Sequence, residues 1–507
     1  MQEEALTTKE MRVLELNCEY LGADLGTLMQ NAGREVAREI DKRIDVQGRK
    51  ILILSGRGGN GGDGMVAAIH LHEAGASVEI CLLGSEDRIT NNDTEANWNI
   101  IKNLDGIKKQ ELKTESAVKS CYAIDDADII IDGMLGFGLG GNVREPIKSA
   151  VERVNASEAA IFSIDIPTGI DSDTGKVWGT AVKADTTITM HAPKVGLLKA
   201  KEYTGEIVTV SIGIPPEADQ ICGPGDLSVM AGRRPPYSHK GDYGRILVIG
   251  GSDVFSGAPA LCGLAALRTG ADLVEIIAPD PVVPAIRSYS PSMIVHGLGT
   301  EVLSLESVDK VTKLAKKCDV TAIGPGLGVQ KDTARAVCKI LEAVTDMEKK
   351  IVVDADGLKS IAGELTSFNA QDSVLTPHWG ELGVLLEKEL DNSKDLDNRI
   401  RCALEAANQY NAVVLLKGHI DVVAEPDGGY KLNKTGTPAM TVGGTGDVLT
   451  GITAAFLARH ETSFRSACAS AFVSGVAGEK AFDDLGYHII PTDCIDQIPE
   501  AIRLFNH

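Results

Sequence analysis

Short apolar runs separated by amphipathic segments dominate the hydrophobic pattern of this chain. Twelve runs of three to seven mostly apolar residues have the length of buried strands. Between them, 65–74 and 147–154 have apolar residues at helical spacing, and 7–40 also looks largely helical. Strands that alternate with helices predict parallel sheets with helical crossovers, so we expect an α/β fold class. The candidate strands are 50–55, 77–83, 128–132, 160–165, 186–191, 206–212, 245–249, 273–278, 320–323, 350–354, 373–375 and 413–417.

A dense group of prolines and glycines interrupts this pattern near the middle of the chain. Ile214-Pro215-Pro216 is followed by Cys222-Gly223-Pro224-Gly225, and this composition predicts the end of regular structure. Because 507 residues exceed what one hydrophobic core usually supports, we expect two domains. We place the first domain at 1–217, a linker at 218–225 and the second domain at 226–507. The two halves carry different motifs, so they are not duplicates.

Composition and charge narrow the possible function classes. The hydrophobic share of 43% is that of a globular protein, and no apolar run is long enough to span a bilayer. The formal net charge of −21 argues against a protein that binds nucleic-acid backbones. The ten cysteines form no Cys-x-x-Cys pair, and the first residues lack the basic and apolar regions of a signal peptide. We therefore expect reduced thiols, a cytoplasmic location, and no membrane or nucleic-acid partner.

The most informative motif is Gly443-Gly444-Thr445-Gly446-Asp447, which is followed by residues with helical character. Glycines let backbone N–H groups turn toward one point, and the start of a helix adds unpaired donors and partial positive charge. This geometry suits a phosphoryl group in transfer. Asp447 can take the proton from a hydroxyl that attacks the phosphorus. The alternative is a plain glycine-rich turn with an acid at a helix N-terminus.

A second glycine-rich stretch, 55–64, follows the strand at 50–55. Its glycines at 56, 58 and 61 fit the G-x-G-x-x-G pattern of a dinucleotide fold, and we expect a helix to begin after them at Met65. Taken alone, the pattern supports a Rossmann dehydrogenase, but it recurs at 136–141 and is weak evidence. Asn60 and Asp63 lie inside the loop. An amide and a carboxylate there favour a polar headgroup or a cation over a bare pyrophosphate.

Two further acids end predicted strands of the first half. Asp132 ends the strand at 128–132, and Asp165 ends the strand at 160–165, just before Pro167-Thr168-Gly169. The carboxyl ends of parallel strands meet at one edge of a sheet, where such folds bind ligands. Oxygen ligands of this kind suit a hard or alkali cation and not zinc. The alternative is that these acids only cap helices.

The first half resembles the NAD(P)H-hydrate epimerases over roughly 1–215, in the segments 28–34, 55–64, 132–139 and 163–171. The resemblance implies a Rossmann-like three-layer sandwich, a potassium ion held by Asn60, Asp132 and Thr168, and Asp165 acting at the reacting carbon. The family usually has Glu where this chain has Gln30, Asn where it has Gly59, and a different residue pair at Gly133-Met134. The residues implied to contact the hydrated nucleotide are Gly59, Asn60, Gly61, Gly62, Asp63, Gly136, Phe137, Gly138, Leu139, Gly140, Gly141, Asn142 and Asp165.

The second half resembles the ADP/ATP-dependent NAD(P)H-hydrate dehydratases of the ribokinase-like fold. Six motifs occur in the family's order, at 239–252, 256–271, 324–328, 375–381, 416–421 and 433–447. The resemblance implies that Asp447 is catalytic and that magnesium and ADP or ATP are required. The residues implied to bind the hydrate are Ala258, Gly326, His378 and Asp447. Those implied to bind the nucleotide are Lys417, Gly418, His419, Ile420, Asp421 and Gly446.

The chemistry of a hydrated nicotinamide explains why two such domains would be joined. Epimerisation at C6 needs an acid/base group close to that carbon, and Asp165 is the candidate. Removal of the C6 hydroxyl is easier once it is a phosphate ester, with Asp447 as the base and the amides of Gly443–Gly446 as donors. Asp354, Asp356 and Glu381 are further acids near this site, and we expect the first two to cap helices.

We therefore expect a bifunctional enzyme that epimerises the R and S hydrates NADHX and NADPHX and dehydrates the S epimer, releasing phosphate. The alternative is a kinase of the hydroxymethylpyrimidine or hydroxyethylthiazole type, with an N-terminal domain that only binds, as in mRNA-decapping scaffolds. The product discriminates between them, because a kinase leaves a stable phosphorylated alcohol. We also expect a homo-oligomer. The sequence leaves open whether ADP or ATP is the donor.

Overall fold

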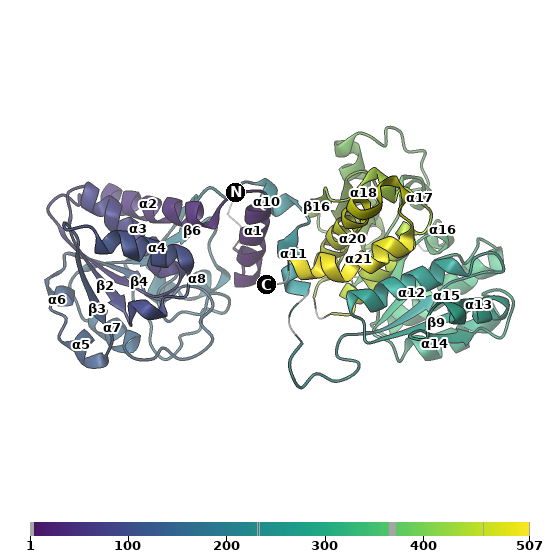
Figure 1. The fold of residues 1–507 in the computed structure, drawn as a ribbon, viewed down its shortest axis with the longest axis horizontal. Helices are drawn as coiled ribbons and strands as arrows, with labels where there is room; N and C mark the ends of the chain where they lie inside the picture. Colours follow the sequence, from purple (N-terminus) through teal and green to yellow (C-terminus); the bar gives the residue numbers. More distant parts are fainter. Residues whose placement is uncertain (1–4, 231, 233, 365–371, 460, 506–507) are drawn as a thin grey trace. The chain divides into compact units, whose positions relative to one another are not determined.

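The chain folds into two compact units, Met1–Ala218 and Asp219–His507 (Figure 1). The computed structural model describes residues 5–230, 232, 234–364, 372–459 and 461–505. Both units are built from a sheet with helices on its two faces, as the alternation of strands and helices predicts. Among the residues described, no helix combines the length and the apolar character needed to span a membrane.

The first unit contains a seven-stranded parallel sheet in the order β3-β2-β1-β4-β5-β6-β7. The strand order reverses between β1 and β4, and this switch point is where folds of this kind bind ligands. The strands are β1 Lys50–Ser55, β2 Ser77–Leu83, β3 Lys108–Leu112, β4 Ile129–Gly133, β5 Ala160–Ile164, β6 Thr186–Met190 and β7 Glu206–Val210.

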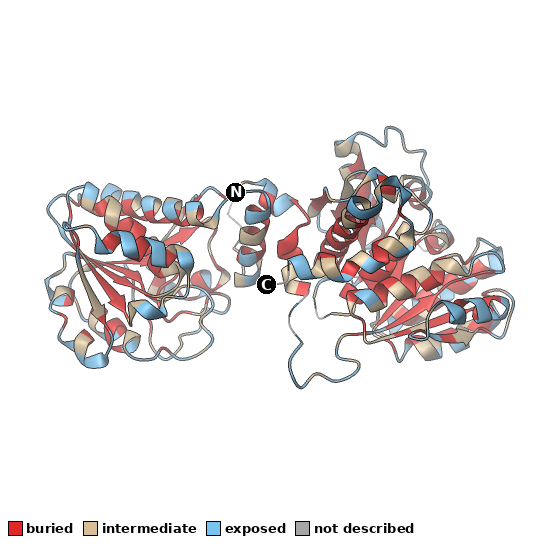
Figure 2. Cartoon of the chain, viewed as in Figure 1, coloured by how far each residue is buried: buried red, intermediate tan, exposed pale blue. Residues whose placement is uncertain are grey.

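Helices cover both faces of this sheet and bury it (Figure 2). Ile51 and Ile53 of β1 pack with α1 to α4 on one face, whereas Leu52 and Leu54 pack with α5 to α7 on the other. Because β1 is buried on both faces, its sequence is a continuous apolar run and does not alternate between apolar and polar residues. The helices are α1 Thr8–Tyr20, α2 Leu25–Arg43, α3 Gly59–Glu73, α4 Asn92–Lys102, α5 Glu115–Lys119, α6 Ala123–Asp126, α7 Ile147–Val154, α8 Val195–Lys199 and α9 Lys201–Thr204.

The second unit contains a nine-stranded sheet in the order β10-β9-β8-β11-β12-β13-β14-β15-β16. Its strands from β10 to β14 pair in parallel, and β15 and β16 add an antiparallel hairpin at the edge. The strands are β8 Arg245–Ile249, β9 Leu273–Ala278, β10 Ile294–Gly297, β11 Val320–Ile323, β12 Lys350–Val353, β13 Ser373–Leu375, β14 Val413–Leu416, β15 Asp421–Ala424 and β16 Tyr430–Asn433.

Two helical layers enclose this sheet. Ile246 and Val248 of β8 pack on the layer of α11, α12, α13, α19, α20 and α21, whereas Leu247 and Ile249 pack on the layer of α14 to α18. The helices are α11 Pro224–Met230, α12 Gly257–Thr269, α13 Val283–Tyr289, α14 Val308–Ala315, α15 Lys331–Asp346, α16 Asp356–Ile361, α17 Trp379–Leu385, α18 Leu396–Tyr410, α19 Thr445–Leu457, α20 Ser463–Leu485 and α21 Pro491–Leu504.

The twelve strands predicted from the hydrophobic pattern are present, with ends that agree or differ by at most two residues. Four strands were not predicted, namely β3, β10, β15 and β16. β3, β10 and β16 are the outermost strands of their sheets, and β15 lies next to the edge strand β16. All four are short, with four or five residues, and give little apolar signal.

Two local predictions are wrong. The prolines and glycines at 214–225 do not end regular structure, because α10 forms at Glu217–Gln220 and α11 begins at Pro224; the proposed linker 218–225 is partly helical. Proline has no backbone N–H group, and the N–H groups of a first helical turn have no partner within the helix. A helix can therefore begin at Pro224 without the loss of a hydrogen bond. The helix after the first glycine-rich stretch begins at Gly59 and not at Met65. The glycines at 59, 61, 62 and 64 therefore belong to the helix.

Replacing Gly451 of α19 by alanine is expected to destabilise the second unit by roughly 1–3 kcal/mol. A Cβ at this position would lie 2.1 Å from the carbonyl oxygen of Cys262 and 2.8 Å from the Cβ of Ala265, both on α12. Hydrogen exchange of α12 and α19 peptides in increasing urea measures the loss. Gly257→Ala is the matched control, because an added Cβ there meets nothing within 4 Å. Equal protection in the two variants would contradict close packing of α12 on α19.

Candidate active sites

A cavity of about 550 Å³ opens at the carboxyl edge of the first sheet. The loop after β1, the loop after β4 and the ends of β5 and β6 contribute its polar lining. Asn60, Asp63 and Asp165 line it, as the sequence predicts for residues that follow parallel strands. Glu15 and Lys194 line it as well, and sequence reasoning missed both.

Asp165 is held in a strained backbone conformation at the end of β5. Its φ of 62° lies in the left-handed region, which aspartate tolerates better than most residues, and its side chain is buried. The Oδ1 atom forms an ion pair with Lys194 Nζ. It also accepts hydrogen bonds from Thr189 Oγ1 and Met190 N, each at 3.2 Å. Among the described residues, no hydrogen bond reaches Oδ2, so this oxygen is left for a ligand in the cavity.

The charges of Asp165 and Lys194 affect the pKa values of two more acids, Glu15 and Asp63. Burial raises the pKa of Glu15 to about 7, and the nearby charge of Asp165 raises it further while Lys194 opposes the shift. Burial also raises the pKa of Asp63 well above its usual range, with Asp165 and Glu15 adding to the effect. Three carboxyl groups thus face one ammonium group. Such an arrangement favours the protonated forms of Glu15 and Asp63 more than exposure to solvent would, which suits proton exchange with a ligand.

A separate group of oxygen atoms, which does not line the cavity, lies between β4 and the turn after β5. Asp132 accepts hydrogen bonds from Thr168 Oγ1 at 2.6 Å, Thr168 N at 2.8 Å and Ser163 Oγ at 2.9 Å. Burial raises the pKa of Asp132, and these hydrogen bonds partly offset that shift. The alternative in which Asp132 only caps a helix is therefore wrong, because its carboxylate binds the turn at 168.

Asn60 has both side-chain polar atoms buried with no hydrogen-bond partner. A buried amide without partners is costly unless a ligand satisfies it. A Cβ at Gly136 would lie 3.2 Å from the Asn60 Cβ, so the loops after β1 and β4 meet at this residue. Oxygen donors from Asn60, Asp132 and Thr168 therefore fit the chemistry of a hard or alkali cation.

The structure divides the residues that the sequence assigned to substrate contacts. Gly61 and Gly62 face the protein interior, where an added Cβ would collide with Gly56 O at 2.1 Å or Met29 Sδ at 2.5 Å. A second cavity of about 680 Å³ contains Leu139, Gly140, Gly141 and Asn142. Of the residues predicted to contact the substrate, those that line the first cavity are Gly59, Asn60, Asp63, Gly136, Phe137, Gly138, Leu139 and Asp165.

In the second unit, Asp447 lies in the first turn of α19, directly after a fixed backbone turn. Gly444 precedes the helix with a φ of 103°, a conformation that requires glycine, and an added Cβ would lie 2.8 Å from Leu261 and Pro491. Thr445 Oγ1 donates to the carbonyl oxygens of Met440 and Val442. Asp447 is half-buried.

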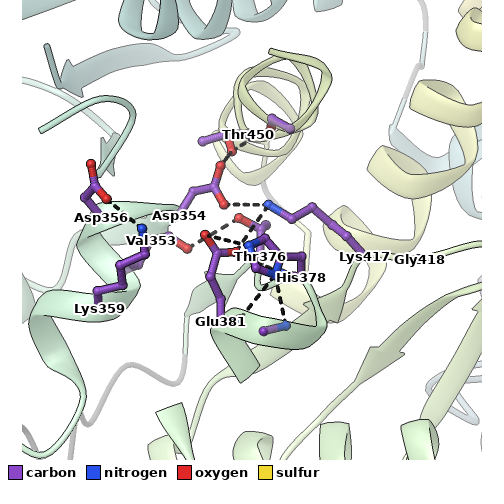
Figure 3. Close-up of polar contacts among 12 residues, drawn as sticks. Val353, Asp354, Asp356, Lys359, Thr376, His378, Glu381, Lys417, Gly418 and Thr450 are labelled. Carbon is purple, nitrogen blue, oxygen red and sulfur yellow. Dashed lines mark hydrogen bonds and ion pairs between the residues drawn. The ribbon is translucent and has the colours of Figure 1, made fainter. Parts of the chain in front are cut away.

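Asp354, at the end of β12, joins three elements of this site (Figure 3). Its Oδ1 accepts from Lys417 Nζ at 2.8 Å and its Oδ2 accepts from Thr450 Oγ1 at 2.6 Å. Lys417 Nζ would lie 3.4 Å from a Cβ at Gly446, so the ammonium group sits against the start of α19. The predicted capping role of Asp354 is wrong. That of Asp356 is also wrong, because its carboxylate accepts from Gly328 N and pairs with Lys359.

His378 and Glu381 form a reciprocal cap at the start of α17 (Figure 3). His378 Nδ1 accepts from Gly380 N at 3.0 Å and Glu381 N at 3.2 Å, and Glu381 Oε2 accepts from His378 N at 2.9 Å. A ring nitrogen that accepts leaves Nε2 as the protonated nitrogen of the neutral imidazole. The His378 side chain is 60% exposed, with Nε2 3.6 Å from Glu381 Oε1, so a ligand can reach the ring.

Burial and the charges around Asp447 shift its pKa into the neutral range. Burial raises the pKa of Asp447 to about 7, and the carboxylate of Asp354 adds to the shift while Lys417 lowers it. Burial lowers the pKa of Lys417, but Asp354 and Glu381 outweigh that effect and raise it overall. A carboxyl group with a pKa near 7 and an ammonium group that stays charged are suited to proton transfer and to phosphate binding, respectively.

The remaining predicted residues of this half fall into two groups. Ala258 and Gly326 are neighbours, because a Cβ at Gly326 would lie 3.4 Å from the Ala258 Cβ. Gly418 and His419 are exposed beside Lys417, whereas Ile420 packs partly on the core. Asp421 accepts from Gly418 N and Asn433 Nδ2, each at 2.9 Å, so its carboxylate fixes the turn that follows Lys417.

The residues of the candidate sites that sequence reasoning missed include Glu15, Lys194 and Thr450. Lys194 comes shortly after the strand at 186–190, and this position at the carboxyl edge is the signal that could have found it. Thr450 lies one helical turn after Gly446, on the same side of α19. Glu15 lies on an amphipathic helix, and nothing in its local sequence separates it from a solvated acid.

Comparison with known proteins agrees with this arrangement. Residues 246–500 match the family model for NAD(P)H-hydrate dehydratase, and residues 25–196 match that for the YjeF-related protein N-terminus. The second unit is also similar to a ribokinase-like superfamily protein from Enterococcus faecalis V583, with a TM-score of 0.50 and 24% identity over 56% of this chain and 95% of that one. That likeness shows the fold alone.

Two curated relatives cover nearly the whole chain. The bifunctional NAD(P)H-hydrate repair enzyme Nnr of Pyrobaculum aerophilum is 43% identical over 99% of this chain and 99% of its own length. The enzyme of the same name from Methanothermobacter thermautotrophicus is 42% identical over 97% of this chain and 94% of its own. Both units and both candidate sites lie within these matches, and the chain belongs to the family of bifunctional NAD(P)H-hydrate repair enzymes.

Proposed function

We propose that this protein repairs hydrated NADH and NADPH in two active sites. The domain at 1–217 epimerises C6 of the hydrate, and the domain at 226–507 dehydrates the S epimer at the expense of ADP or ATP. The observation that carries the proposal is the Asp447 carboxyl group, whose pKa is about 7, in the first turn of a helix next to the Lys417 ammonium. The names of the full-length relatives support both activities.

In the dehydratase site, Asp447 removes the proton of the C6 hydroxyl as its oxygen attacks the terminal phosphorus of the nucleotide. Lys417 and the backbone N–H groups at the start of α19 stabilise the negative charge on the phosphoryl oxygens. Phosphate then leaves C6 while C5 loses a proton, and the dihydronicotinamide forms again. Ala258, Gly326 and His378 would surround the hydrate, whereas Gly418, His419, Ile420 and Asp421 would lie along the nucleotide.

Magnesium, when bound, would neutralise charge on the transferring phosphates. Within the ranges that the structure describes, no group of three His, Cys, Asp or Glu side chains is placed to hold a metal ion. Magnesium commonly takes one or two carboxylates together with phosphates and waters, so the site fits an ion that arrives with the nucleotide.

In the epimerase site, Asp165 carries a proton to and from the hydrate while its other oxygen stays fixed. Lys194 and Thr189 hold Oδ1, so Oδ2 is the oxygen that meets the nicotinamide ring. Glu15 and Asp63 would supply or accept the second proton that the ring needs when it opens or dehydrates transiently. The Phe137 side chain and the glycines around it would cover the ring and limit the entry of water.

A mixture of R and S hydrates is expected to be converted completely to NADH by the wild-type chain with magnesium and ADP or ATP, because epimerisation feeds the dehydratase. The Asp165→Asn variant is expected to convert only the S half at the catalysed rate, since an amide cannot accept the proton. Recovery of dihydronicotinamide absorbance measures both. A stable phosphorylated product would instead indicate a kinase, and complete catalysed conversion by the variant would contradict the role of Asp165.

The rate of dehydration, as kcat/KM, is expected to rise with pH through a midpoint near 7, because Asp447 must lose its proton to act as a base. Asp354→Asn should move the midpoint to lower pH, since a like charge that raises the pKa is removed. The charged and titratable groups facing Asp447 are Asp354, Asp356, Glu381, Lys417 and the thiol of Cys262. An unchanged or higher midpoint in the variant would contradict this assignment.

Epimerisation is expected to slow at least tenfold when potassium is replaced by tetramethylammonium, because the Asn60 amide and the Asp132–Thr168 pair lose their cation. Asn60→Ala should be slow in either salt. Asn99→Ala, an exposed asparagine on α4, is the matched control and should keep the wild-type salt dependence. Equal wild-type rates in both salts would remove potassium from the proposal.

A further inference from the structure

The second cavity of the first unit continues the first. Arg57, Leu83, Leu135, Leu139 and Ile147 line both, so the two form one continuous groove along the carboxyl edge of the sheet. Asp165 lines only the first cavity, and residues 140–146 line only the second. A substrate whose reacting ring lies at Asp165 can therefore extend past Arg57 into the second cavity.

The second cavity is basic, although the whole chain carries a formal net charge of −21. Arg57, Arg88, Lys113 and Arg144 line it, against the two acids Asp87 and Glu145. Local positive charge on an acidic protein favours an anionic ligand at that place, because it raises the local concentration of anions.

Three of these basic residues are available to a ligand. Within the residues that the structure describes, Arg57, Arg88 and Arg144 form no ion pair, whereas Lys113 pairs with Glu111 at 3.0 Å. The stem of Arg57 packs across Gly84, where an added Cβ would lie 3.1 Å from the Arg57 Cδ. This contact holds the guanidinium at the junction of the two cavities.

The positions of these arginines match the anions of a dinucleotide. Its pyrophosphate follows the nicotinamide ribose and would pass the junction at Arg57. Its adenosine would then reach the part of the groove that Arg88 and Arg144 line. NADPHX differs from NADHX by one phosphomonoester on the adenosine ribose, and a guanidinium group is the side chain best matched to a phosphate.

We propose that the second cavity binds the adenosine phosphomonoester of NADPHX, with Arg88 and Arg144 as its phosphate-binding side chains. The inference rests on the proposed epimerase function and adds to it a subsite that separates the two hydrates. Arg57, which borders both cavities, serves the phosphates that both substrates share. Arg88 and Arg144 therefore set specificity, and Arg57 sets affinity for either hydrate.

The test measures epimerisation of each hydrate without added nucleotide, so that dehydration does not occur. The double variant Arg88→Ala/Arg144→Ala is expected to lower the ratio of kcat/KM for NADPHX to that for NADHX at least tenfold. Arg57→Ala should lower kcat/KM for both hydrates by a similar factor. Arg38→Ala is the control, because this exposed arginine of α2 lines neither cavity. The ratio of the two kcat/KM values in this variant should equal that of the wild type.

The outcomes separate the subsite from the function on which it rests. A wild-type chain that epimerises neither hydrate would overturn the proposed function. A chain that epimerises both, with a ratio that the double variant leaves unchanged or raises, would overturn the subsite alone. Arg88→Glu provides a second measurement if the double variant folds poorly, because repulsion should lower the ratio further than Arg88→Ala does.

Discussion

Parallel strands bring the residues that follow them to one edge of a sheet, and both candidate sites depend on this constraint. Asp132 and Asp165 leave neighbouring strands of the first sheet, and Asp354 and Lys417 leave strands of the second. Each of these side chains lies next to the apolar core but receives polar partners from neighbouring strands, loops or a helix that meet at the edge. The sheets therefore supply rigid positions, whereas the loops supply the groups that a ligand contacts.

Burial of a charged group at such an edge costs free energy of desolvation, and each unit offsets this cost with a buried ion pair. One ammonium group pairs with one carboxylate, as Lys194 does with Asp165 and Lys417 with Asp354. The carboxyl groups left without a full partner then have raised pKa values, which are about 7 for Glu15 and for Asp447. An acid with such a pKa can exchange protons at neutral pH, so the same electrostatic imbalance that burial creates provides the chemistry.

The two glycine-rich stretches use glycine for different reasons, although both resemble phosphate loops in sequence. In the first, Gly61 and Gly62 lie within α3 and allow close packing on the loop after β1 and on α2. In the second, Gly444 adopts a left-handed conformation that starts α19, and Gly451 lets that helix approach α12. The glycine pattern alone does not separate packing from ligand contact, because a missing Cβ serves both.

The sequence by itself determined the alternation of strands and helices, the division into two units, and the acids that end buried strands, because these features follow from local periodicity and chain position. It also predicted Asp447 and Asp165 as candidate site residues. The tertiary structure decided the partners of those acids, since Lys417 lies 63 residues from Asp354, Thr450 lies 96 residues from it, and Lys194 lies 29 residues from Asp165. It also decided that Arg88 and Arg144 share a cavity and that Glu15 faces Asp165. Strand order sets these distances, and no local pattern of polar and apolar residues encodes strand order.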